Sequence, residues 1–133
     1  MSDPKVLVLM GSDSDRDVMQ KGVDVLEEHG VEADVRVSSA HREPGKTAEL
    51  ATKAEERGFG VVICGAGLSA ALPGVVASHT DLPVIGVPIS AALGGMDALL
   101  STVQMPPGVP VASVGIDNAR NAAHLALRIL GRG

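Results

Sequence analysis

Short apolar runs alternate along this chain with longer segments whose apolar residues recur at helical spacing. Residues 6–10 form a continuous apolar run, which is typical of a strand covered on both faces. Residues 33–37 alternate between apolar and polar, as expected for a strand with one more polar face near a sheet edge. The pattern predicts three further strands, over residues 61–64, 84–87 and 111–114.

The segments between these strands are predicted to be helices. Residues 15–29 repeat apolar residues every three or four positions, and Ser14 is the predicted N-cap. Pro44 suits the first turn of a helix that is predicted to run to about residue 57. The remaining helices are predicted over residues 70–78, 95–102 and 118–130.

This order of elements predicts one domain over residues 1–133, an α/β fold of the doubly wound kind. Five strands, each followed by a helix, give a parallel sheet flanked by helices, a flavodoxin-like three-layer sandwich. The predicted strand order is 2-1-3-4-5. Ligands of such sheets bind beyond the carboxyl ends of the strands, at the switch point between strands 1 and 3, where the strand order reverses. The rule selects three loops, over residues 11–14, 38–43 and 65–74.

Composition narrows the functional class. The chain has 133 residues, 45% of them hydrophobic, with one Phe and no Trp or Tyr, and a formal charge of −5. Without a basic stripe, nucleic acid is not an expected partner. Apolar runs are far shorter than the roughly 20 residues of a membrane span, and the polar, acidic start is unlike a signal peptide. The single Cys64 excludes an intramolecular disulfide. We therefore expect a cytoplasmic protein that binds neither membrane nor nucleic acid.

The first loop suggests a phosphate site. Ser12 and Ser14 supply hydroxyls beside the free N–H groups of a helix start, and Asp15 suits ribose hydroxyls. The loop lacks the length and Lys of a nucleoside-triphosphate loop and the glycine pattern of a dinucleotide site. Ordinary capping of the helix by these side chains is the alternative, with equal weight.

The second loop contains the candidate acid–base group. His41 can exchange a proton near neutral pH, and Arg42 can hold a phosphate through two hydrogen bonds. Ser39, from the same loop, is a further candidate binding residue. A lone His-Arg pair in a loop is more often simply exposed, but its position at the switch point favours function.

Small residues dominate the third loop. Gly67 and its neighbour Leu68 are candidate binding residues, because small residues let main chain approach a flat heterocycle. Close helix packing in an oligomer is the alternative. His29 is better explained as a helix cap, and His79 and His124 have no partner at metal-ligand spacing. No metal site is predicted, and no G-x-S-x-G elbow indicates a serine hydrolase.

These loops resemble the PurE family, the N5-carboxyaminoimidazole ribonucleotide mutases and the related aminoimidazole ribonucleotide carboxylases. The resemblance extends over essentially the whole chain, in the family's order. It is carried by the stretches Met-Gly-Ser-Asp-Ser-Asp at 10–15, Ser-Ala-His-Arg at 39–42, Gly-Ala-Gly at 65–67, Leu-Pro-Gly at 72–74, Pro-Val-Ile-Gly-Val-Pro at 83–88, Asp-Ala-Leu-Leu-Ser at 97–101, Val-Gln-Met-Pro at 103–106, Gly-Val-Pro-Val at 108–111 and Asn-Ala-Ala at 121–123.

The resemblance implies that Ser12, Asp15 and Arg42 bind a ribonucleotide and that His41 transfers protons. It also implies a homo-octamer, no metal or organic cofactor, and an ATP-dependent partner enzyme that supplies the N5-carboxylated substrate. Mutases usually have a His directly before Leu-Pro-Gly, where this chain has Ala71, and Ser69 faintly resembles the carboxylase branch.

We therefore expect the mutase reaction of purine biosynthesis, with direct carboxylation of aminoimidazole ribonucleotide by CO2 as the alternative. A non-catalytic nucleotide-binding domain is a more remote one. The intact Ser-Ala-His-Arg stretch at 39–42 disfavours the PurE-like carboxylases of a nickel-cofactor pathway.

Overall fold

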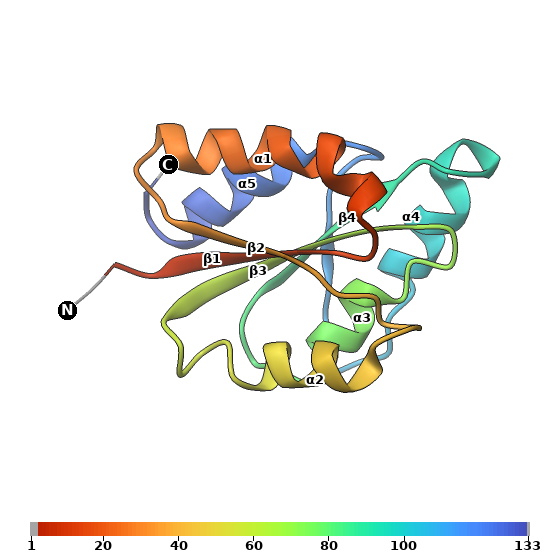
Figure 1. The fold of residues 1–133 in the computed structure, drawn as a ribbon, viewed down its shortest axis with the longest axis horizontal. Helices are drawn as coiled ribbons and strands as arrows, with labels where there is room; N and C mark the ends of the chain where they lie inside the picture. Colours follow the sequence, from red (N-terminus) through yellow and green to blue (C-terminus); the bar gives the residue numbers. More distant parts are fainter. Residues whose placement is uncertain (1–2, 133) are drawn as a thin grey trace.

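The computed structural model describes residues 3–132, which form a parallel sheet between two layers of helices (Figure 1). The longest helix has 13 residues, and none in this range has the length and apolarity to cross a membrane. The strands are β1 (Lys5–Met10), β2 (Ala33–Val37), β3 (Phe59–Gly67), β4 (Val84–Ile89) and β5 (Ala112–Ser113). The helices are α1 (Arg16–Glu28), α2 (Pro44–Thr52), α3 (Leu72–Ala77), α4 (Met96–Val103) and α5 (Ala119–Ile129), with short 3-10 turns η1 (Asp13–Asp15) and η2 (Leu93–Gly95).

The strand order is β2-β1-β3-β4-β5, as predicted. All neighbouring strands are parallel, and Met10 at the end of β1 lies opposite Val37 of β2 and Gly65 of β3. From β1 the chain continues to β2, toward one lateral edge of the sheet, whereas from β3 it continues to β4, toward the other lateral edge. The loops that follow β1, β2 and β3 meet at one edge, which is where the topology predicts a ligand.

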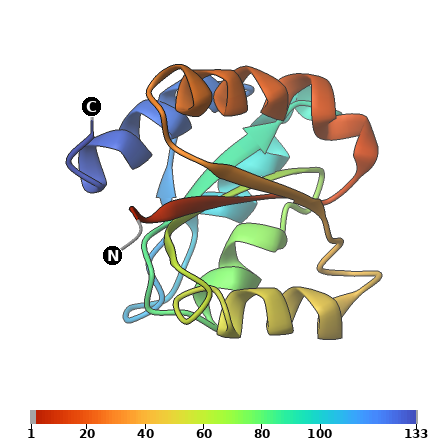
Figure 2. The same cartoon turned by 60° about the vertical axis from the view of Figure 1, so that its left-hand side comes forward.

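Each face of the sheet is covered by its own helices. Figure 2 shows α1 and α5 on one face, with α2 and α3 on the other. Alternate residues of β1 show the division, because Val6 and Val8 pack toward α1 and α5 whereas Leu7 and Leu9 pack toward the opposite layer. Two aliphatic cores built mainly from Val, Leu, Ile and Ala result, with Phe59 in the second.

Helix α1 begins later than predicted, and Ser14 is not its N-cap. The 3-10 turn η1 comes first, and its own N-cap, Ser12, accepts a hydrogen bond from the N–H of Ser14 at 3.3 Å. Asp15 then occupies the N-cap position of α1 without a side-chain cap bond. The cluster of serines and aspartates therefore builds a turn rather than extending the helix.

Other boundaries also differ from the prediction. Helix α2 ends at Thr52 because residues 53–58 tighten into turns, with the Ala54 N–H bonded to the Ala51 carbonyl. Strand β3 continues to Gly67, since its small residues pair with β4 although they are poor strand formers by pattern. Strand β5 is only two residues long, because its pairing with β4 is confined to Ala112 and Ser113.

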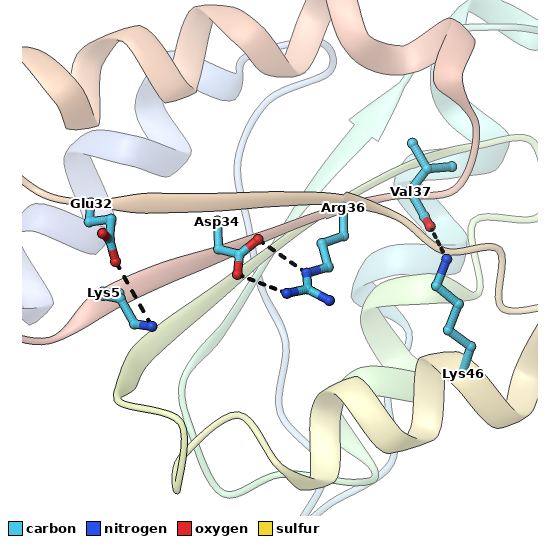
Figure 3. Close-up of polar contacts among 6 residues, drawn as sticks. All are labelled: Lys5, Glu32, Asp34, Arg36, Val37 and Lys46. Atoms are coloured by element: carbon cyan, nitrogen blue, oxygen red, sulfur yellow. Dashed lines mark hydrogen bonds and ion pairs between the residues drawn. The ribbon is translucent and has the colours of Figure 1, made fainter.

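Strand β2 lies at an edge and has the polar character that its alternation predicted. Asp34 and Arg36 form a two-bond ion pair along it, at 3.1 and 3.2 Å (Figure 3). Lys46 of α2 donates a hydrogen bond to the carbonyl of Val37 at 2.9 Å. This contact ties the start of α2 to the end of β2, directly beside the second candidate loop.

Candidate active site

The three candidate loops enclose one cavity of about 480 Å³ at the carboxyl edge of the sheet. Small-molecule sites typically measure about 300–1,000 Å³. The cavity is lined by every residue that the sequence nominated, namely Ser12, Ser14, Asp15, Ser39, His41, Arg42, Gly67 and Leu68. Residues from three separate parts of the chain therefore share one concave surface.

The first loop presents two hydroxyls and a carboxylate. The oxygens of Ser12 and Ser14 lie 2.9 Å apart, and both side chains are exposed. Asp15 follows at the start of α1, where the helix dipole favours negative charge. Partial burial raises the pKa of the Asp15 carboxyl, although a backbone hydrogen bond from Ser12 opposes the shift. A partly desolvated carboxylate of this kind is well suited to accept hydrogen bonds from ligand hydroxyls.

The second loop is a compact turn that presents two exposed side chains. Ser39 accepts a hydrogen bond at its hydroxyl from the Arg42 N–H at 3.1 Å, and its carbonyl accepts one from the Glu43 N–H at 2.8 Å. His41 and Arg42 are therefore displayed from a turn closed by backbone bonds. Within residues 3–132 neither the imidazole nor the guanidinium makes a hydrogen bond or ion pair, which leaves both available to a ligand.

The third loop lines the cavity over residues 66–72, and the glycines of β3 that lead into it run close to neighbouring segments. A Cβ at Gly65 would overlap the sulfur of Met19, and one at Gly67 would lie 3.1 Å from the carbonyl oxygen of Ile89. A larger residue at either position would therefore require Met19 or the segment at Ile89 to shift. Leu68 follows with a positive φ of 54°, a strained conformation for a branched side chain and one that concentrates at ligand sites.

Sequence reasoning missed Ala91, which lines the cavity from the loop after β4. The usable signal was topological, since the carboxyl end of β4 lies at the same sheet edge as those of β1 and β3. Ala71 also lines the cavity.

The other histidines lie elsewhere. The Nδ1–H of His29 donates to the carbonyl of Val25 at 2.9 Å, the capping contact expected of it. His124 is exposed on α5 with its ring centroid 6.1 Å from that of His29. His79 lines a larger cavity of about 920 Å³ at the amino ends of β4 and β5, whose described lining includes no Lys or Arg.

Two further features bear on the chemistry of the site. Among residues 3–132 no group of three or more His, Cys, Asp or Glu side chains is arranged to hold a metal ion. Cys64 is fully buried in β3, and burial raises the pKa of its thiol. It behaves as a small core residue.

Comparison with known proteins finds relatives along nearly the whole chain. The family model described as AIR carboxylase matches residues 5–133. A protein of Pyrococcus horikoshii named N5-carboxyaminoimidazole ribonucleotide mutase is 61% identical over 129 residues, which cover 96% of this chain and 73% of that protein. The mutase of the same name from Pyrococcus abyssi is 60% identical over 128 residues, covering 96% of this chain and 74% of that protein.

A solved structure shares both sequence and fold with the chain. The crystal structure of Treponema denticola PurE superimposes with a TM-score of 0.86 at 34% identity, covering 96% of this chain and 80% of that one. The match includes the sheet and the layers that form the cavity. By sequence along nearly its whole length and by fold, the chain belongs to the AIR carboxylase family, that of PurE.

Proposed function

We propose that this chain converts N5-carboxyaminoimidazole ribonucleotide into 4-carboxy-5-aminoimidazole ribonucleotide, a step of purine biosynthesis. The observation that carries the proposal is the convergence of His41, Arg42, Ser12 and Asp15 on one cavity of about 480 Å³. The relatives that share most of the chain's length are named for this mutase reaction.

The cavity lining matches the parts of such a substrate. The Arg42 guanidinium and the hydroxyls of Ser12 and Ser14 are donors for a phosphate. The Asp15 carboxylate accepts hydrogen bonds from ribose hydroxyls. The main-chain wall at Gly67 leaves a flat surface for the imidazole ring, with Ser39 at the opposite loop.

The reaction needs one group that gives and then takes a proton, the role we assign to His41. Its imidazolium protonates the carbamate nitrogen while the N–C bond breaks, so the electron pair returns to nitrogen and CO2 is released. Carbon 4 of the aminoimidazole is enamine-like and attacks CO2 to form the new C–C bond. The proton on carbon 4 then passes to the neutral imidazole, which restores the starting state.

The walls have a second task, to keep the released CO2 beside carbon 4. CO2 that stays in the cavity reacts with carbon 4 in an effectively unimolecular step. This step is faster than a reaction with the dilute CO2 of the solution, which depends on a collision. Ala66, Ala70 and Ala71 line the cavity without polar side chains that would compete for CO2. No cofactor is needed in this scheme, because the ring itself is the nucleophile.

Ala71 favours one alternative, direct carboxylation of aminoimidazole ribonucleotide. It leaves the cavity without a second imidazole at the position where mutases usually have one, and Ser69 also lines the cavity. Both reactions share the attack of carbon 4 on CO2 and differ in the origin of the CO2.

The proposed function predicts that turnover does not depend on bicarbonate. Purified protein should convert the N5-carboxylated substrate at a rate that changes by less than about twofold as bicarbonate is varied, because CO2 arises inside the cavity. Product formation is followed by ultraviolet absorbance, with aminoimidazole ribonucleotide plus bicarbonate as the parallel substrate. Fast conversion of the unmodified ribonucleotide, with none of the N5-carboxylated form, would replace the mutase with the carboxylase.

We also propose that the chain assembles as a homo-octamer. Met96, Leu100 and Val103 are each about half exposed and form one stripe along α4, with the more exposed Leu93 just before it. By contrast, the small residues of α5 are covered by α1 and the sheet of the same chain, so they leave little surface for a partner.

Light scattering at micromolar concentration should give eight times the mass of one chain. Leu100→Glu should yield smaller species, because it places a charge within the apolar α4 stripe. Lys21→Glu, on the exposed face of α1, is the matched control and should leave the mass unchanged. A monomeric wild-type protein would contradict the assembly.

The substrate is a labile carbamate that reverts to amine and CO2, so an ATP-dependent enzyme that carboxylates aminoimidazole ribonucleotide would maintain its supply. We propose such an enzyme as the metabolic partner and the cytoplasm as the compartment. The single, unpaired Cys64 fits a reducing environment.

A further inference from the structure

A pair of hydroxyls is buried directly beneath the loop that presents His41. In residues 3–132 the fully buried polar side chains are Ser38, Thr47 and Thr102, each 0% exposed. The hydroxyl oxygens of Ser38 and Thr47 lie 2.7 Å apart. Ser38 directly follows β2, and Thr47 lies in the first turn of α2. Their hydrogen bond therefore connects the two elements on either side of the loop.

Further hydrogen bonds connect the first turn of α2 to the loop over residues 39–43 and to the end of β2. The Thr47 hydroxyl lies 3.4 Å from the carbonyl of Ser39, so it can donate there while accepting from Ser38. The Thr47 N–H donates to the carbonyl of Glu43 at 3.1 Å. Lys46 adds its bond to the carbonyl of Val37, seen in Figure 3. Both ends of the loop over residues 39–43 are thus fastened to the same turn of α2.

These contacts matter because no hydrogen bond within residues 3–132 holds the exposed side chains of His41 and Arg42. The loop backbone therefore decides where these side chains lie. Two apolar side chains would fill the same buried space at similar stability, since burying a hydroxyl pair yields little net free energy. An apolar pair would lack the directional bond that holds β2 and α2 in one register.

We propose that Ser38 and Thr47 are positioning residues that hold the His41 loop in its reactive geometry. The proposal rests on the proposed function only in taking His41 as the acid–base group. The two side chains touch no substrate, because neither lines the cavity. They act through the backbone of residues 39–43.

The test compares single and double substitutions. Thr47→Val leaves the Ser38 hydroxyl buried and unpaired, so its melting temperature should fall by several degrees. The double variant Ser38→Ala/Thr47→Val removes both polar groups and should recover most of that loss. In both, kcat should fall about tenfold, because a small displacement of a catalytic group has a large cost. Thr47→Ser keeps the hydroxyl and should keep kcat within about twofold of wild type.

Thr102→Val is the matched control. Thr102 is equally buried, but its hydroxyl donates to the Ala98 carbonyl within α4, away from the cavity. This variant should lose stability without a tenfold loss of kcat. A double Ser38→Ala/Thr47→Val variant with wild-type kcat would overturn the proposal and make the hydroxyl pair a packing feature only.

Hydrogen–deuterium exchange over residues 38–47 supplies a readout that does not need turnover. The amides of Arg42 and Glu43, which bond to Ser39, should exchange about tenfold faster in the double variant and at the wild-type rate in Thr102→Val. If the wild type converts neither ribonucleotide, the proposed function fails while this measurement still decides the positioning. Unchanged exchange in the double variant would overturn the positioning role itself.

Discussion

His41→Asn should lower kcat about a thousandfold while the protein still binds its substrate. Asparagine has a similar size and keeps a hydrogen-bond donor, but it cannot exchange a proton near neutral pH. General acid–base groups contribute roughly 10²–10⁴ to rate, and here one imidazole serves both proton transfers. Rates of conversion of the N5-carboxylated ribonucleotide and calorimetric titration, measured on the same preparation, separate chemistry from binding.

His79→Asn is the matched control for this variant. His79 is also exposed, but it lines the other cavity, at the opposite ends of the strands. It should retain wild-type kcat. If His41→Asn turned over at the wild-type rate, the assignment of His41 as acid and base would be wrong, whatever the control showed.

Arg42→Ala should raise the dissociation constant of the ribonucleotide by at least about a hundredfold. Hydrogen bonds to charged groups contribute about 1.5–3 kcal/mol each, and a guanidinium can offer two of them to one phosphate. Ser12→Ala and Asp15→Asn should weaken binding less. Ser12→Ala removes one neutral donor to the phosphate, and Asp15→Asn keeps one oxygen that can accept a hydrogen bond from the ribose. Calorimetric titration with aminoimidazole ribonucleotide measures all three.

Arg36→Ala controls for the loss of positive charge as such. Arg36 is exposed on β2 and paired with Asp34, and it does not line the cavity. Its removal should leave the dissociation constant within about twofold of wild type. Binding as tight as wild type in the Arg42, Ser12 and Asp15 variants together would move the site elsewhere on the molecule.

The sheet and its strand order could be predicted from the sequence because several independent features of the sequence indicate the same arrangement. Continuous apolar runs such as residues 6–10, spaced by helical segments, leave few topologies that keep crossovers right-handed. The start of α1 and the end of β3 were mispredicted, because local hydrogen bonds and strand pairing decide them rather than the pattern of apolar residues. The Ser12 hydroxyl bonds to the hydroxyl and the N–H of Ser14, which builds a separate turn and delays the start of α1. Strand β3 extends to Gly67 through pairing with β4, a tertiary contact that no local pattern reports.

The candidate site was predictable to the level of loops and less so in its details. Parallel topology brings the ends of β1, β2 and β3 together, so Ser12, His41 and Gly67 could be grouped from the order of the elements alone. Ala91 could not be found by chemistry, since an alanine has none to reveal. The pairing of Ser38 with Thr47 also depends on how α2 packs under its own loop, which sequence spacing alone does not determine.

The glycines of β3 have a thermodynamic consequence for ligand binding. Gly65 and Gly67 belong to a strand hydrogen-bonded on both sides at Gly65, with Met19 and Ile89 packed against the backbone. Gly67, which lines the cavity at the end of this strand, is therefore ordered by the fold itself, so a ring that stacks on it loses its own freedom without freezing protein torsions. The conformational entropy lost by the protein then comes from the opposite side, where His41 and Arg42 exchange many exposed rotamers for one. One side of the cavity provides a preformed shape, and ordering the side chains of the other side costs conformational entropy when a ligand binds.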